Sequence, residues 1–189
     1  MCPSISGKDI EFKPVNKQQI TENNLVSSCK QPDVCLQTLR VTLYSFDKEK
    51  TVRVLIDTGS QRSYIRSDLA RELGYVARGK HEVKHLLFGG LESECEKHNI
   101  YQVRVKSLCN SYACNFEAMD QKIICANVSS VNDFNFGNEL SAENIILIDI
   151  GDEINSIDLL IGADVAGKLL TGKKLDLKNG LTAIETRLG

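Results

Sequence analysis

Residues 52–60 decide the fold of this chain: Val52-Arg53-Val54-Leu55-Ile56-Asp57-Thr58-Gly59-Ser60. The apolar and mostly β-branched run before Asp57 predicts a buried strand that ends at this aspartate. Such a strand holds the Asp57 carboxylate rigidly, Thr58 supplies a hydroxyl beside it, and Gly59 lets the backbone turn close to a reacting group. Taken alone the signal is weak, because Asp, Thr and Gly are also ordinary turn residues.

A second motif lies about a hundred residues further along the chain, at Ile157-Asp158-Leu159-Leu160-Ile161-Gly162-Ala163-Asp164. It is a short apolar strand that ends at Gly162, and the helix-like run 165–170 follows it. We expect Ile161, Gly162 and Ala163 to pack beside the loop that carries Asp57, with another backbone passing close to Gly162.

The two acidic residues of this motif are expected to have structural roles. Asp164 is the strongest rival to Asp57, but its position predicts that it caps the helix after it or pairs with a basic group such as Arg62. Asp158 precedes the apolar strand and is expected at the surface or in a turn.

The two motifs together resemble the retropepsin-like aspartic proteases. Three stretches, Leu55–Ile65, Ile157–Asp164 and Gly180–Gly189, are similar to the protease domain of Pao/BEL-type LTR retrotransposon polyproteins. The resemblance covers residues 36–189. It implies an all-β fold, the retropepsin-like closed β-barrel or acid protease fold, with one or two short helices. Residues 1–35 are polar and lack periodicity, which predicts a disordered leader or linker.

The Asp-Thr-Gly motif occurs once in the sequence, and no internal repeat is present. Water activation by carboxylates needs two of them, which share one proton, as is established for aspartic-protease dyads. A chain with a single Asp57 therefore needs a second copy of itself across a two-fold axis. We expect a homodimer that acts on a polypeptide substrate.

The resemblance also implies roles for the neighbours of Asp57. Thr58 would hydrogen-bond across the dimer axis and brace the two active-site loops, and Gly59 would present its backbone to the substrate. Ser60 would hydrogen-bond with the Asp57 carboxylate. For Thr58 and Ser60, simple capping of a turn is an equal alternative.

An aspartic peptidase also needs a mobile hairpin that covers the substrate and excludes water. The best candidate is the segment 86–92, in which Gly89 and Gly90 form a flexible tip, while Leu87 and Phe88 supply apolar contacts. An ordinary hairpin with a Gly-Gly turn is the alternative, and the flanking motifs favour the flap.

The rest of the chain predicts many short strands. We expect strands over 36–44 and 51–56, a helix over 67–74 with Ser67 as its N-cap and Gly74 as its stop, and strands over 83–88, 100–107 and 116–128. The run 132–144 reads as a polar insertion, and 145–148 and 157–161 read as buried strands. A last hairpin over 174–186 turns at Asn179-Gly180.

The bulk properties exclude several classes of function. A net charge of −2 gives no basic footprint for nucleic acid, no apolar stretch is long enough for a membrane span, and the N-terminus lacks an apolar signal region. We therefore expect a cytoplasmic protein, with virus-like particles as a further location that the resemblance suggests.

No metal or other cofactor is expected. His81, His85 and His98 form no ligand spacing with cysteine or carboxylate residues, and phosphate-binding glycine patterns are absent from the sequence. Seven cysteines without a paired spacing predict separate thiols, although a disulfide between Cys109 and Cys114 remains open.

The sequence thus predicts an aspartic endopeptidase of retrotransposon origin that cleaves a polyprotein. The main alternative is a catalytically silent retropepsin-like module for dimerisation or peptide binding, and a domesticated host protease is a third possibility. Intact Asp57 and Thr58 favour activity.

Overall fold

The computed structural model describes residues 35–85, 88–90, 93–125, 128, 139–143, 145–150 and 156–189. The leader expected over 1–35 lies outside these ranges except for Cys35. So does most of the polar insertion expected over 132–144.

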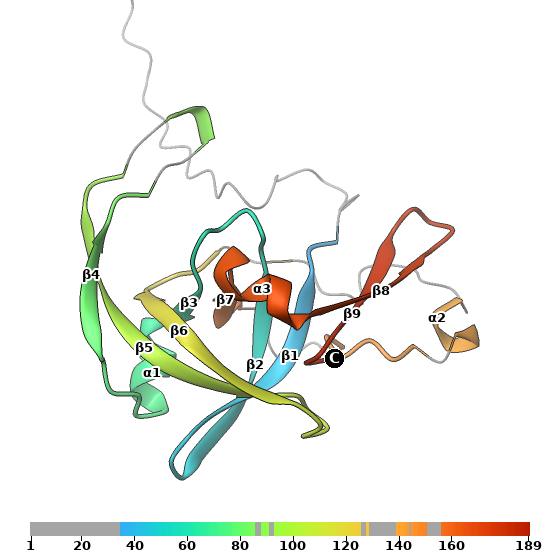
Figure 1. The fold of residues 1–189 in the computed structure, drawn as a ribbon, viewed down its shortest axis with the longest axis horizontal. Coiled ribbons are helices and arrows are strands. Elements are labelled where there is room, and N and C mark those ends of the chain that lie inside the picture. The colour runs from blue at the N-terminus through green and yellow to red at the C-terminus, as the bar shows by residue number, and fades with distance from the viewer. Residues whose placement is uncertain are drawn as a thin grey trace, which may run out of the picture.

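Seven strands form one sheet that closes into a barrel (Figure 1). In sheet order they are β1 (Thr38–Ser45), β2 (Lys48–Ile56), β7 (Leu159–Ile161), β3 (Tyr64–Arg66), β6 (Ala113–Gln121), β5 (Glu96–Lys106) and β4 (Gly79–Val83). Pairing of β1 with β5, through Thr42 opposite Lys106 and Leu43 opposite Val105, closes the barrel, and β4 lies outside it on β5. The expected all-β closed barrel is confirmed.

The sequence pattern explains the two strands that lead to Asp57. In β1 every second residue is buried, because one face of the strand covers the barrel core and the other lies nearer solvent. In β2 the last five residues, Val52–Ile56, are all buried. The chain therefore delivers Asp57 from the fully buried end of β2.

The helices of the described ranges are short: α1 (Ser67–Glu72), α2 (Glu139–Ala142), α3 (Ala163–Leu169) and the 3₁₀ turn η1 (Phe88–Gly90). Gly74 ends the α1 segment at φ 72°, a conformation that favours glycine. The expected N-cap at Ser67 is wrong, because Arg66 holds the cap position without a side-chain cap and Ser67 begins the helix. None of these helices has the length and apolar character needed to cross a lipid bilayer.

The expected terminal hairpin is confirmed as β8 (Leu170–Asp176) and β9 (Thr182–Thr186), which form a separate two-stranded sheet. Gly180 turns the chain at φ 85°, and the Asn179 side chain accepts a hydrogen bond from Leu181 N at 3.1 Å. The hairpin extends away from the barrel in Figure 1.

Three expected strands differ from the structure. The strand predicted over 116–128 is β6 at Ala113–Gln121, and residues 122–125 lie beyond its end. The strand predicted over 83–88 is wrong, since the pairing strand is β4 at Gly79–Val83, opposite Glu96–Ile100 of β5. The run 145–148 is neither a strand nor buried as predicted, and the Ile146 side chain is 83% exposed. Asp149, directly after this run, is the buried residue instead.

Candidate active site

Asp57 follows the end of β2, where two central strands meet. β2 runs parallel to β7, with Ile56 opposite Ile161, and Asp57 N donates to Ile161 O at 3.0 Å. The first residue of the loop is therefore hydrogen-bonded to the last residue of β7, within the second sequence motif. The Asp57 side chain is half-buried, and Thr58 and Gly59 are exposed.

The loop 57–60 folds back on the Asp57 carboxylate. Gly59 N donates to Asp57 Oδ1 at 2.9 Å, and Ser60 N donates to the Asp57 carbonyl oxygen at 3.2 Å. A Cβ on Gly59 would lie 3.2 Å from Asp57 Oδ1, so a side chain there would press on the carboxylate. The backbone N–H of Gly59 thus orients one carboxylate oxygen and leaves Oδ2 for other partners.

The expected hydrogen bond between the Ser60 side chain and the Asp57 carboxylate is wrong. Ser60 Oγ donates to the Arg62 carbonyl oxygen at 2.9 Å, within the same turn. The alternative, that Ser60 caps a turn, describes this contact.

Gly162 lies where the backbone of the Asp57 loop passes closest to α3. A Cβ at Gly162 would lie 2.6 Å from the Arg62 carbonyl carbon and 2.9 Å from Ser60 O, which is too close for any side chain. Ala163 N donates to Ser60 O at 2.8 Å, and Ile161 is fully buried beneath the loop. Ile161, Gly162 and Ala163 therefore form the support on which the loop rests.

Ser63 joins the two motifs, and sequence reasoning missed it. Its side chain is 1% exposed; Ser63 Oγ donates to Asp164 Oδ1 at 2.8 Å, and Ser63 N donates to Oδ2 at 3.2 Å. Gly162 N donates to the same Oγ at 3.1 Å. A serine four residues after a glycine is too common in turns to stand out in a sequence.

The role expected for Asp164 is corrected by these contacts. Gly162 is the N-cap residue of α3, without a side-chain hydrogen bond, and Asp164 lies in the first turn of the helix. Its carboxylate accepts both hydrogen bonds from Ser63 rather than capping the helix.

The residues expected to form a flap are only partly described. Leu87 lies outside the described residues, and of Phe88 only the backbone is described, within η1. Gly89 and Gly90 are exposed and have φ values of 81° and 76°, which an L side chain rarely adopts. The tip of the β4–β5 hairpin and the loop after β2 lie at the same end of the barrel in Figure 1.

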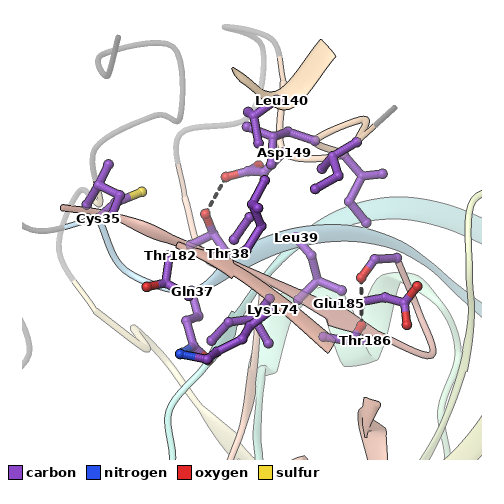
Figure 2. A pocket seen from close by; sticks show the side chains of 18 of the residues that line it. Cys35, Gln37, Thr38, Leu39, Leu140, Asp149, Lys174, Thr182, Glu185 and Thr186 are labelled. Atoms are coloured by element: carbon purple, nitrogen blue, oxygen red, sulfur yellow. Dashed lines mark hydrogen bonds between the residues drawn. The ribbon is translucent and has the colours of Figure 1, made fainter. Parts of the chain in front are cut away.

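A cavity of about 570 Å³ lies beside the Asp57 loop rather than over it. Its walls are the start of β1, the segment 145–149 and the β8–β9 hairpin, and Ile56 is the lining residue next to Asp57 (Figure 2). Thr38 Oγ1 donates to Asp149 Oδ2 at 2.5 Å at one side of this cavity.

Asp149 also anchors a buried ion pair that the sequence did not reveal. Arg53 and Asp149 are 1% and 3% exposed, and Arg53 Nε lies 2.9 Å from Asp149 Oδ2. Arg53 Nη1 donates to Val128 O at 2.8 Å. The pair fastens the segment 145–149 to β2.

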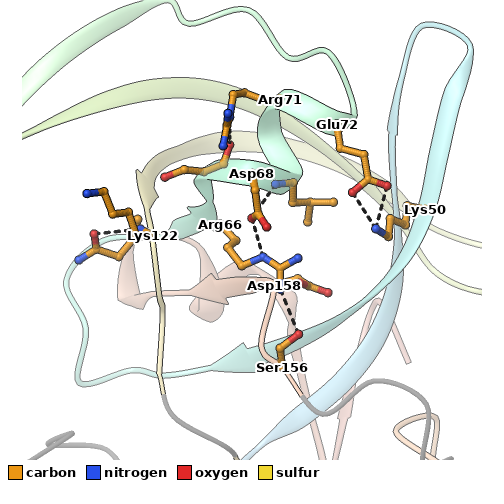
Figure 3. A network of polar contacts seen from close by, with 11 residues as sticks. Lys50, Arg66, Asp68, Arg71, Glu72, Lys122, Ser156 and Asp158 are labelled. Carbon is orange, nitrogen blue, oxygen red and sulfur yellow. Dashed lines mark hydrogen bonds and ion pairs between the residues drawn. The ribbon is translucent and has the colours of Figure 1, made fainter. Parts of the chain in front are cut away.

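A further polar network joins β3 and α1 to the residues before β7 (Figure 3). Arg66 contacts Asp68 Oδ1 at 2.6 Å and Asp158 Oδ1 at 2.9 Å. Asp158 is 5% exposed, so its expected surface position is wrong. Burial raises the pKa of Asp158, and the nearby positive charge of Arg66 opposes that shift.

The five cysteines of the described ranges are free thiols, and Cys109 and Cys114 are therefore not joined. Hydrogen bonds from Ser111 and Ser107 lower the pKa of Cys109 to about 7. Burial raises the pKa of Cys125 to about 11.

The family described as aspartyl protease matches residues 41–165. The chain is similar to EIAV protease in complex with an inhibitor, at 17% identity and a TM-score of 0.35, over 60% of this chain and 92% of that chain. It is also similar to the retroviral protease-like domain of Ddi1 from Leishmania major, at 13% identity and a TM-score of 0.37, over 81% and 94% of the two chains. No curated protein matches the chain.

Proposed function

The chain belongs to the aspartyl protease family, and on that premise we propose that it is an aspartic endopeptidase of Pao/BEL-type retrotransposon origin. Its substrate is a polyprotein in the cytoplasm, its active form is a homodimer, and residues 36–189 are the peptidase domain. The observation that carries this proposal is the setting of Asp57: a half-buried carboxylate at the end of a central strand, oriented by Gly59 N at 2.9 Å.

In the dimer, two Asp57 carboxylates meet across the two-fold axis and share one proton, because two like charges a few ångströms apart cannot both persist. The ionised carboxylate takes a proton from a water molecule as the water oxygen attacks the peptide carbonyl carbon. The protonated carboxylate gives its proton to the carbonyl oxygen, which yields a neutral tetrahedral diol.

Breakdown of the diol returns the dyad to its starting state. One diol hydroxyl gives its proton to the ionised carboxylate as the carbonyl re-forms and the C–N bond breaks. The leaving nitrogen takes a proton from the other carboxylate, so one proton again remains on the pair. Attack and release use only the water and the two side chains.

Exposure of the loop tip supports the dimer. Thr58 and Gly59 are exposed in the single chain, although they lie next to a half-buried carboxylate. In the proposal Thr58 hydrogen-bonds across the two-fold axis and Gly59 presents its backbone to the substrate. The β8–β9 hairpin, which extends from the barrel, contributes the second part of the interface.

The flap is assigned to the β4–β5 connection. Gly89 and Gly90 form its tip, and Leu87 and Phe88 supply its apolar contacts with the substrate. Positive φ values at both glycines support a tip that only glycine forms without strain. Closure over the dyad would exclude bulk water during the reaction.

The test compares the full chain with Asp57→Asn on polyprotein-derived peptides at mildly acidic pH. The parent should cleave and be inhibited by pepstatin-type transition-state mimics, whereas Asp57→Asn should leave the peptides intact. Asp47→Asn, in the exposed β1–β2 turn, is the matched control and should cleave like the parent.

Cleavage by Asp57→Asn at the parent's rate would show that another group does the chemistry. A parent that dimerises and binds the peptides without cleaving them would instead establish the silent binding module.

A further inference from the structure

Three potential metal ligands meet where the pairing of β4 and β5 ends and their connection begins: His85, Glu96 and His98. Their ligand atoms all lie within 4.8 Å of one another. His85 lies two residues after the end of β4. Glu96 and His98 lie at the start of β5, where Val83 pairs with Glu96. The sequence does not reveal this group of three ligands, because strand pairing and not a regular spacing brings the residues together.

His98 is prepared to bind through one defined nitrogen. The side chain is 3% exposed, and its Nδ1 lies 2.5 Å from the carbonyl oxygen of Asp120. A carbonyl oxygen only accepts, so Nδ1 carries a proton, and in the neutral ring the lone pair then lies on Nε2. Metal-binding histidines usually donate their other N–H to a carbonyl or carboxylate in this way, which fixes the ring and the tautomer.

The second histidine faces this lone pair. His85 Nε2 lies 3.4 Å from His98 Nε2, and the two rings are inclined at 81°. Two nitrogens bound tetrahedrally to Zn²⁺ at about 2.0–2.1 Å are separated by about 3.3–3.4 Å. The observed separation therefore matches that of two ligands on one metal ion.

The backbone of His85 is held on both sides. His85 N donates to Ser93 Oγ at 2.9 Å, and Ser93 N donates to His85 O at 2.9 Å. The Tyr64 ring packs against both imidazoles, with centroids 5.9 Å and 6.2 Å away. One wall of the cluster is thus aromatic and fixed.

Glu96 supplies the charge that a divalent cation requires. Glu96 Oε2 lies 3.9 Å from His98 Nε2, and its side chain is 54% exposed, so a small rotation brings it into ligand range. Two imidazoles and one carboxylate leave a fourth tetrahedral position for water, a donor set that Zn²⁺ accepts.

We propose that His85, Glu96 and His98 bind one divalent transition metal ion, with Zn²⁺ the best match to the donors. The ion links the residue after β4 to the start of β5, on either side of the connection that contains Gly89 and Gly90. It therefore stabilises the folded chain and restricts the motion of the two ends of this connection. The proposal does not depend on peptidase activity. A simple hydrogen bond between the two imidazoles is the competing interpretation.

The test uses the full chain, stripped of metal and with its thiols reduced, titrated with Zn²⁺ by calorimetry and with Co²⁺ by absorption spectroscopy. We expect one ion per chain, a Co²⁺ spectrum without a thiolate charge-transfer band, and a Zn²⁺-dependent rise in melting temperature. His85→Gln and Glu96→Gln should each weaken binding at least as much as loss of an outer-shell partner does, roughly 10- to 100-fold.

His81→Gln is the matched control, because His81 is exposed and lies opposite His98 in the same strand pair but outside the cluster. It should bind like the parent. Glu96 is exposed, so Glu96→Gln should stay folded and give a readable result. Absence of Zn²⁺ binding by the parent, or equal binding by the parent, His85→Gln and Glu96→Gln, would overturn the proposal in favour of the plain hydrogen bond or of binding by cysteines.

Discussion

Single residues around the Asp57 loop are constrained by distance rather than by backbone conformation. Gly162 has φ −84° and ψ −178°, which any residue adopts, yet a Cβ there meets the Arg62 carbonyl group and Ser60 O. Ser63 is buried beside this loop, and its hydroxyl and backbone N–H both donate to the Asp164 carboxylate. The position of Asp57 thus depends on contacts made by two small residues that have no part in the chemistry.

Gly162→Ala should destabilise the fold, because the new methyl group overlaps two backbone carbonyl groups. Overpacking of this kind costs about 1–3 kcal/mol in the free energy of unfolding, which urea denaturation measures. Gly167→Ala is the control. Gly167 lies in α3 with nothing within 4 Å of a Cβ, so this change should raise the free energy of unfolding by about 0.5–1 kcal/mol. Equal effects of the two substitutions would show that the loop does not rest on Gly162.

Cys109 should be the most reactive thiol of the described residues at neutral pH. Cys109 Sγ lies 3.0 Å from Ser111 Oγ and 3.5 Å from Ser107 Oγ, and these hydrogen bonds lower its pKa to about 7. Because the thiolate is the nucleophile, alkylation should rise with pH through a midpoint near 7. Peptide mapping by mass spectrometry measures this, with Cys125 (pKa about 11) as the slow reference.

Ser111→Ala removes one of these donors and should move the Cys109 midpoint to higher pH. An unchanged midpoint would mean that the hydroxyl does not stabilise the thiolate.

At the scale of elements, the barrel is held to its surrounding segments by buried charges. Arg53 of β2 pairs with Asp149, and Thr38 of β1 donates to the same carboxylate. This pairing explains why the apolar run 145–148 is not a buried strand: the segment is anchored by its polar end while Ile146 faces solvent.

Asp149→Asn should lower the free energy of unfolding by about 3–5 kcal/mol, because it leaves the buried Arg53 without its opposing charge. Glu72→Gln is the matched control: its ion pair with Lys50 at 2.7 Å is exposed, and such pairs contribute about 0–1 kcal/mol. Thermal and urea unfolding give both values. A cost for Asp149→Asn no larger than that of Glu72→Gln would mean that the pair does not fasten the segment.

The β8–β9 hairpin should contribute to dimerisation. Ile184 of β9 is 38% exposed, and a charge there would be buried unpaired in an interface. Ile184→Asp should raise the dimer dissociation constant at least about tenfold, which is about 1.4 kcal/mol, as measured by sedimentation at several concentrations. Phe46→Asp, at an 86% exposed position in the β1–β2 turn, should leave it unchanged. Equal constants for both variants and the parent would place the interface elsewhere.

For the molecule as a whole, strong local patterns predicted several elements of the barrel, and the resemblance to a known family predicted that the sheet closes. The β-branched run before Asp57, the Asn179-Gly180 turn and Gly74 at the end of the α1 segment all match the structure. β4 was misplaced because its first four residues are exposed and none of them is apolar, so only its pairing with β5 reveals it. Ser63 was missed because its partner Asp164 lies far away in the chain. The His85–His98 pair was missed because strand pairing, and not a regular spacing, brings the two rings together.

The central claim is that two chains each supply one Asp57 to a shared site, and a mixing experiment tests it most directly. The parent is combined with a ninefold excess of Asp57→Asn, equilibrated above the dimer dissociation constant, and assayed for peptide cleavage per parent chain. If only parent–parent dimers cleave, random pairing should reduce this activity to about one tenth. Activity that stays unchanged in the presence of the excess variant would contradict the account.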